Sequence, residues 1–179
     1  GYITYYQTPR FTVGIDNPFI PAATRAEMQQ RGLTSLALGR VHTDLGDDRG
    51  RLQRGTWDTT RVVAGVRGRL FNSIDWDAYI QHGESGSLTE VPQDVSPPNL
   101  LAAFYAVPGS GGEPVCGPVA TNPNLTDAQR AAVQPGCVPF NPFGVNTRSA
   151  AALDYVTHHA FSDTRVKQDV AALNLRFNP

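Results

Sequence analysis

The stretch T-W-D-T-T-R-V-V-A-G-V-R-G-R-L-F-N-S-I-D-W-D-A-Y-I-Q-H-G, residues 56–83, decides the fold. Its side chains alternate with a period of two, which predicts two β-strands joined by a turn at Asn72-Ser73. One face of the first strand consists of Val62, Ala64, Val66, Gly68 and Leu70, and the other of Thr59, Arg61, Val63, Gly65, Arg67 and Arg69. The second strand repeats this division, with Trp76, Ala78 and Ile80 on one side and Asp75, Asp77, Tyr79 and Gln81 on the other.

The two faces of this predicted hairpin differ in chemistry. One is thin and apolar, whereas the other carries three arginines and two aspartates. Such a division suits a sheet with lipid on one side and a wet lumen on the other. Phe71 and Trp76 flank the turn, where a membrane barrel places its interfacial aromatic residues. A soluble amphipathic hairpin in a β-sandwich has the same alternation, so the pattern alone leaves both folds open.

The composition favours β-structure with long irregular loops. The chain has 179 residues, of which only 17% are charged, together with 17 glycines and 14 prolines. It has no run of eighteen or more apolar residues, so no transmembrane helix is predicted. The net charge of −1, without a basic stripe, argues against a nucleic-acid partner. Because the chain starts at Gly1 without an initiator methionine, we expect a processed or internal segment of a longer protein.

The first part of the chain predicts short strands and one helix. Residues 2–15 form a β-like run that Pro9 breaks, and residues 21–31 predict a helix with Thr24 as N-cap and Gly32 as the residue after its end. Residues 36–43 predict another strand and residues 44–50 a polar turn. We therefore expect a hairpin running from Leu36 to Arg61.

The alternation ends after Gly83, and residues 84–150 predict a long loop rich in proline, glycine and serine. Helices are expected at 98–107 and at 126–133, the second with Thr126 as N-cap. Cys116 and Cys137 predict one disulfide that closes a loop of about twenty residues, contributes roughly 3 kcal/mol and implies an oxidising compartment. Two unpaired thiols are the alternative.

The last part of the chain predicts a short helix at 150–156 and a strand at 164–177. One face of this strand carries Ala171, Leu173, Leu175 and Phe177, and the other carries Asn174 and Arg176. The strand therefore repeats the division of the hairpin, with an apolar strip beside a polar one.

Five segments carry a family resemblance: D-N-P-F-I-P-A (16–22), R-V-V-A-G-V-R-G-R-L (61–70), W-D-A-Y-I-Q-H-G (76–83), G-C-V-P-F-N-P-F-G (136–144) and A-A-L-D-Y-V (151–156). In this order and spacing they resemble the barrel of TonB-dependent outer-membrane receptors of the alpha-proteobacterial type, over nearly the whole chain. The resemblance implies an all-β fold, a segment of a transmembrane antiparallel β-barrel with long extracellular loops and a few short loop helices. It also implies a periplasmic turn at 72–73 and extracellular segments at 44–55 and 84–163.

A barrel of about 22 strands needs more than about 200 residues for its strands alone. We therefore expect residues 1–179 to be a middle piece of such a receptor. Residues 1–33 would form an extracellular loop with a short helix, 34–83 strands and hairpins, 84–163 the disulfide-containing extracellular loop, and 164–179 a strand.

The resemblance implies energy-coupled uptake of a bulky nutrient: siderophore-bound iron, a cobalamin-like molecule or an oligosaccharide. The implied partners are the rest of the barrel and plug, the TonB complex acting through the plug, outer-membrane lipid, and a small-molecule or glycan ligand. The implied location is the bacterial outer membrane with the loops facing outwards, and neither enzymatic activity nor a cofactor is expected.

Some loop side chains are able to stack on a ligand or hydrogen-bond to it, although packing of the loop against its neighbours is the more common role for each. These candidates are Phe19, Tyr105, Phe140, Asn141, Phe143 and Asn146. Arg61, Arg67 and Arg69 are expected to pair with carboxylates of neighbouring strands or of the plug.

Other kinds of site are weaker alternatives. His158-His159 offers two metal ligands, but adjacent histidines on a loop are usually solvated. Asp44, Asp47 and Asp48 lack the spacing of an EF-hand. Asp75 and Asp77 resemble the carboxylate pair of a surface hydrolase. A soluble secreted β-rich binding module, for example for glycans, stabilised by the disulfide, is the main alternative to the receptor.

Overall fold

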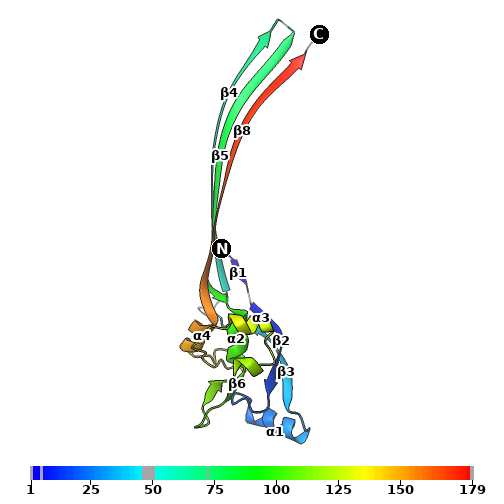
Figure 1. The fold of residues 1–179 in the computed structure, drawn as a ribbon, viewed down its shortest axis with the longest axis vertical. Coiled ribbons are helices and arrows are strands. Elements are labelled where there is room, and N and C mark those ends of the chain that lie inside the picture. Colours follow the sequence, from blue (N-terminus) through cyan, green and yellow to red (C-terminus); the bar gives the residue numbers. More distant parts are fainter. Residues whose placement is uncertain (1, 5, 46–50, 72, 178–179) are drawn as a thin grey trace. The chain divides into compact units, whose positions relative to one another are not determined.

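The computed structural model describes residues 2–4, 6–45, 51–71 and 73–177. The chain divides into two compact units: unit 1 comprises Gly1–Gln53 and Val91–Ala160, and unit 2 comprises Arg54–Glu90 and Phe161–Pro179. Three long strands have residues in both units: β4 (Arg51–Leu70), β5 (Ile74–Val95) and β8 (Thr157–Phe177) (Figure 1). Strands make up 51% of the residues, which confirms a β-rich chain, and the described strands do not close into a barrel.

Unit 2 is an antiparallel sheet in which β5 lies between β4 and β8 (Figure 1). The register of β4 and β5 pairs Val66 with Ala78 and Leu70 with Ile74. Phe71 adopts a left-handed conformation (φ 49°) in the connecting turn, and the Ser73 amide donates to the carbonyl oxygen of Leu70 at 3.2 Å. The predicted hairpin is confirmed, although Asn72 of its turn lies outside the described residues.

The prediction of an irregular segment beginning at residue 84 is wrong. Strand β5 continues to Val95, and β8 begins at Thr157 rather than at Thr164. Residues 83–90 read G-E-S-G-S-L-T-E and so lack the apolar alternation that identifies a strand. They are strand because each pairs in register with a residue of β4, from Arg61↔Gly83 to Arg54↔Glu90. Cross-strand pairing here outweighs a weak intrinsic β-propensity.

Unit 1 contains two two-stranded sheets, and it also contains β1, which belongs to the sheet of β4, β5 and β8. Strand β1 (Tyr2–Thr4) pairs with the start of β4, whereas β2 (Tyr6–Gly14) pairs with β3 (Ser35–His42). The hairpin expected from Leu36 to Arg61 is therefore wrong, because the partner of β3 is β2. The register of β2 and β3 shifts between Thr8 and Phe11, where proline 9 has no N–H to donate. The expected break is thus an irregularity within one strand.

The helices of unit 1 are found at the predicted positions, but the helix expected at 98–107 ends at Phe104, and residues 106–108 are strand. Helix α1 spans Ala22–Gln30 and its N-cap is Pro21, so the prediction of Thr24 as its N-cap is wrong. Gly32 has a φ of 63° and follows the helix end as predicted; its amide donates to Gln29 O and the Leu33 amide to Met28 O. Helix α3 (Asp127–Ala132) has the predicted Thr126 cap. The remaining elements are α2 (Pro97–Phe104), α4 (Ala150–Val156), the 3₁₀ turn η1 (Val119–Thr121) and the hairpin of β6 (Ala106–Pro108) with β7 (Pro114–Cys116).

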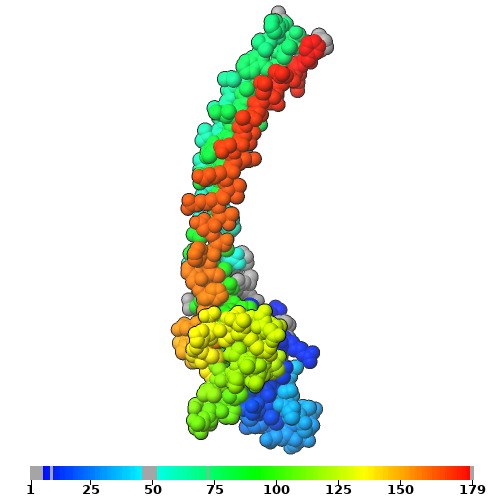
Figure 2. Space-filling model, viewed as in Figure 1, coloured from blue at the N-terminus to red at the C-terminus, as the bar shows by residue number. Residues whose placement is uncertain are grey.

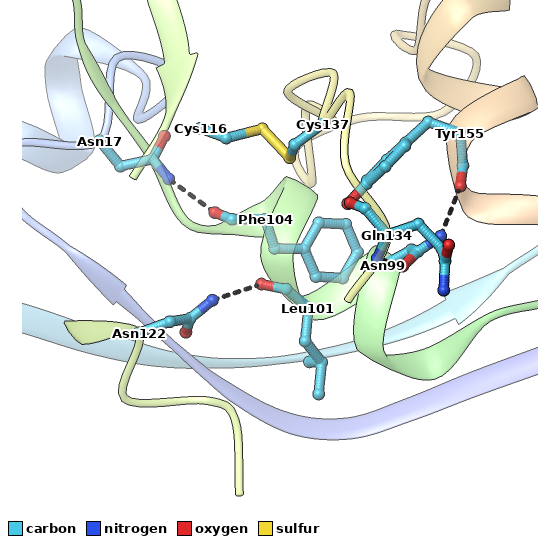
Figure 3. Close-up of a disulfide and its surroundings, with 9 residues drawn as sticks. All are labelled: Asn17, Asn99, Leu101, Phe104, Cys116, Asn122, Gln134, Cys137 and Tyr155. Carbon is cyan, nitrogen blue, oxygen red and sulfur yellow. Dashed lines mark hydrogen bonds between the residues drawn. A yellow bond between two sulfur atoms is a disulfide. The ribbon is translucent and has the colours of Figure 1, made fainter. Parts of the chain in front are cut away.

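The C-terminal end of α2 is the centre of unit 1. A helix leaves its last four carbonyl groups without partners inside the helix. Here all four carbonyl oxygens accept hydrogen bonds. The Asn122 side chain donates to Leu101 O at 3.1 Å and the Asn17 side chain to Phe104 O at 3.0 Å. The Tyr105 amide donates to Ala102 O at 3.2 Å and the Phe140 amide to Ala103 O at 3.0 Å. Figure 3 shows the asparagines at 17 and 122 reaching this helix end. Three distant loop segments are thus fixed to one short helix.

The core of unit 1 forms around the Phe104 side chain, which is fully buried. Its ring stacks on Phe11 at 4.5 Å and meets Phe140 edge-on at 5.5 Å between centroids. The predicted disulfide is confirmed: Cys116 at the end of β7 is bonded to Cys137, three residues before Phe140 (Figure 3). The disulfide therefore links the β6–β7 hairpin to the segment that supplies a core ring.

Candidate functional site

Three Asn-Pro dipeptides shape loops of unit 1, and two of these loops contain candidate ligand-binding residues. In each, the asparagine Oδ1 accepts the amide of the residue two positions on. The pairs are Asn17 with Phe19 (3.0 Å), Asn122 with Asn124 (2.9 Å) and Asn141 with Phe143 (2.9 Å). This is an Asx turn whose middle residue is proline, a combination that fixes the local backbone. The recurrence of Asn-Pro in the sequence was the signal that could have revealed these turns.

The six candidate residues do not meet at one place. Phe140 lies in the core, and Phe19, Asn141 and Phe143 are half-buried in their Asx turns. Tyr105 is also half-buried, and its ring lies 2.6 Å from where a Cβ on Gly117 would stand. Of the six, only Asn146 is exposed. The contacts assign these side chains to loop structure, and ligand binding by them stays a prediction.

Arg40 and Asp44 form a buried pair that anchors the loop at 141–146. The Arg40 guanidinium donates to Asp44 Oδ2 at 2.6 Å and to Pro142 O at 2.6 Å, and its Cζ lies 5.7 Å from the centre of the Phe140 ring. Asp44 Oδ2 also accepts the Asn146 amide at 3.0 Å. Burial acts to raise the pKa of Asp44, but these two donors and the positive charges of Arg40 and Arg148 outweigh it and leave the pKa below its ordinary value.

His42 lies on β3 between these two residues and is fully buried. Its ring stacks on Phe104 at 5.9 Å, and its Nε2 lies 3.0 Å from Thr8 Oγ1. Among the described residues its Nδ1 has no hydrogen-bond partner. Burial, joined by the positive charge of Arg40 and opposed by Asp44, lowers the pKa of His42 from 6.5 to about 4. His42 is therefore a neutral core residue at pH 7.

The sheet of unit 2 carries a continuous apolar face, which we call the apolar band. Its side chains are Val62, Ala64, Val66, Leu70, Trp76, Ala78, Ile80, Ala171, Leu173, Leu175 and Phe177. Val66 is 63% exposed, Ile80 65% and Leu173 64%, so no other described part of the chain covers them. Figure 2 shows no other segment of the chain over the side of this unit that is in view. The predicted alternation is thus realised in the structure.

The apolar band ends at a row of charged contacts. His82 Nδ1 lies 2.6 Å from Asp169 Oδ1, and Lys167 Nζ lies 3.8 Å from Glu84 Oε1. Beyond them the same face continues with Asp58, Asp163 and Arg165, which line a hollow of about 600 Å³. From Ile74 to His82 the band covers eight residue steps, or about 27 Å along the strand.

The opposite face of unit 2 is polar near the turn. Arg69 Nε donates to Asp75 Oδ1 at 2.7 Å, and Asn174 Nδ2 donates to Asp77 Oδ2 at 2.7 Å. Arg61 donates to Gln81. The predicted pairing with a neighbouring-strand carboxylate is confirmed for Arg69. Asp75 and Asp77 each have a cross-strand partner of their own, which is not the arrangement of a shared acid/base pair.

The remaining candidates give no site among the described residues. His158 and His159 lie in β8 rather than on the predicted loop, so their side chains point to opposite faces of the strand. Asp47 and Asp48 lie outside the described residues. In the part of the chain that the structure describes, no three His, Cys, Asp or Glu side chains are placed to hold a metal ion.

Comparison with known proteins yields no assignment. The chain matches no family model, no curated protein and no solved structure. None of the helices in the described residues has the length and apolar character needed to cross a membrane.

Proposed function

We propose that this chain is part of the β-barrel of an outer-membrane TonB-dependent receptor, which imports a bulky nutrient. The observation that supports the proposal most strongly is the uncovered apolar band. A soluble sheet buries such a face under a second layer, whereas Val66, Ile80 and Leu173 remain more than half exposed. Hydrocarbon is the environment that would cover this face without any other protein layer.

The dimensions of the apolar band fit this environment. Strands of outer-membrane barrels tilt by about 40°, so about 27 Å of strand corresponds to a height of about 21 Å. The apolar zone of such barrels is about 25 Å tall. The exposed aromatic residues Phe71 and Phe177 lie at the turn end of the band, and the contacts of His82 with Asp169 and of Glu84 with Lys167 lie at the other end. The turn end therefore carries the aromatic residues expected at a bilayer interface, and the other end is marked by polar and charged side chains.

The asymmetry of the connections is consistent with the same proposal. The connection of β4 to β5 is a turn of three residues, 71–73, whereas β5 and β8 are separated by residues 96–156, the segment with the disulfide and helices α2 to α4. Short periplasmic turns and long extracellular loops are general features of outer-membrane barrels. In this proposal the turn is periplasmic and unit 1 is an extracellular loop domain.

The test is the behaviour of the polypeptide that carries this chain, expressed in a Gram-negative host. A barrel segment will be extracted from the outer-membrane fraction only by detergent, and the extracted protein will migrate differently on a gel before and after heating. Recovery of a monomer from the aqueous fraction without detergent would instead favour the soluble secreted binding module, and the receptor proposal would have to be abandoned.

A further inference from the structure

The polar face of unit 2 changes character along its strands. Next to the turn it carries five charged residues, Arg67, Arg69, Asp75, Asp77 and Arg176. Farther along, β8 must be placed by its register with β5. The contacts His82–Asp169, Glu84–Lys167 and Asp77–Asn174 all fit one antiparallel register, in which Gln168 is opposite Gly83 and Thr164 is opposite Ser87.

At this distance from the turn the charges are segregated to one face. The face that continues the apolar band holds Asp58, Glu84, Asp163, Arg165 and Lys167. The other face, beyond Arg61, is uncharged within the described residues. Its side chains are Trp57, Thr59, Ser85, Ser87, Thr164, Val166 and Gln168, and Thr59 Oγ1 lies 3.1 Å from Ser85 Oγ. We call this second surface the hydroxyl face.

Trp57 is the only large aromatic side chain among the residues of the hydroxyl face, and it is 72% exposed. Its ring folds back over Gly55. A Cβ on that glycine would stand 2.8 Å from both Cζ2 and Cζ3 of the indole. The absence of a side chain at position 55 therefore permits this ring position, which leaves most of the indole surface open to solvent.

We propose that the hydroxyl face binds a neutral glycan. The apolar C–H surface of a sugar ring stacks on an exposed indole, and its hydroxyl groups exchange hydrogen bonds with serine, threonine and glutamine side chains. An anionic chelate needs opposite charge, which this face lacks. The inference rests on the proposed function, because the barrel lumen is what would bring a ligand to this face rather than to the charged one.

The experiment uses the receptor that carries this chain, purified in detergent. The probes are an array of neutral oligosaccharides, an array of uronic-acid oligosaccharides, and ferric citrate as an anionic chelate. We expect retention of neutral oligosaccharides, a loss of affinity of at least tenfold in Trp57→Ala, and a loss of several-fold in Gly55→Ala, where the new Cβ displaces the ring. The matched control is Leu88→Ala, next in sequence to Ser87 but on the other face, which should leave the affinity unchanged.

Three results would overturn the inference: no neutral oligosaccharide is retained, only the acidic probes bind, or neutral binding is indifferent to Trp57→Ala. Gel mobility of the same preparations before and after heating separates this failure from that of the proposed function. A heat-modifiable protein that fails the glycan test is still a barrel, with a different ligand.

Discussion

Three valines of β4 provide the sharpest test of the lipid-facing sheet. Val66 lies four residues from the Leu70↔Ile74 pair at the turn and four from Val62, which is opposite His82 at the charged border. It is therefore at the middle of the apolar band. Val62 lies at its edge, and Val63 lies on the opposite, polar face. The three positions share residue type and strand but differ in depth and in face.

Arginine at each position should give three different costs. In a barrel, an arginine facing lipid at the midplane destabilises by about 2–4 kcal/mol, and one near the interface by about 0–1 kcal/mol. We therefore expect about 2–4 kcal/mol for Val66→Arg and about 1 kcal/mol or less for Val62→Arg. Val63→Arg faces water and should stay within about 0.5 kcal/mol of the parent protein.

The assay is guanidinium unfolding of the full polypeptide in phosphatidylcholine vesicles, followed by tryptophan emission and by gel mobility without heating. The slope of the unfolding free energy against denaturant should be the same for all variants, so that midpoints report stability. Equal costs at Val62 and Val66 would indicate a second protein layer over the face, and no cost at Val66 would indicate water. Either result refutes the placement of lipid against the band.

Other predictions concern unit 1. His42 has a lowered pKa in the folded state, so its contribution to stability is full above about pH 6.5 and is lost as the pH falls towards 4. The shift of the pKa from 6.5 to about 4 corresponds to about 3 kcal/mol of unfolding free energy. Urea unfolding of the parent protein and of His42→Gln, each at pH 7 and pH 4.5, will measure it. The pKa of Asp44 is also lowered, so its contribution is lost only at lower pH, as its carboxyl group is protonated. Asn17→Ala and Asn122→Ala each leave a carbonyl of α2 without its donor and should cost about 1–3 kcal/mol by the same assay, whereas exposed Asn146→Ala should cost less. Removing the disulfide with Cys116→Ser and Cys137→Ser should cost roughly 3 kcal/mol, and an unchanged midpoint between oxidised and reduced protein would contradict this.

The elements that the sequence revealed are those with a local signal. The hairpin of residues 56–83 alternates with period two, Thr126 and Gln129 form a complete capping box, and the helix at 150–156 is found with those bounds. In each case neighbouring residues determine the conformation. The disulfide was predictable because a chain with two cysteines has one possible intramolecular pair.

The features that escaped prediction depend on partners distant in sequence. Residues 83–90 are strand because β4 pairs with them, and β3 pairs with β2 rather than with β4. The prediction of Thr24 as N-cap failed because the N-cap is Pro21, which has no side-chain cap hydrogen bond, and the helix already begins at Ala22. The candidate ligand residues were chosen for exposed aromatic and amide chemistry, whereas Phe140 is drawn into the core by Phe104, which lies 36 positions earlier.

The segregation of charge in unit 2 links the two proposals. If the sheet stood in water on both sides, charged residues beyond the apolar band would gain nothing from being on one face, because water solvates either face equally. They lie instead on the face of Val66 and Ile80, whereas the described part of the Trp57 face beyond Arg61 in unit 2 is uncharged. A bilayer interface on one side accounts for the first distribution, because charged side chains there meet lipid head groups. A neutral ligand on the other side accounts for the second, so the valine series and the glycan array examine opposite surfaces of one sheet.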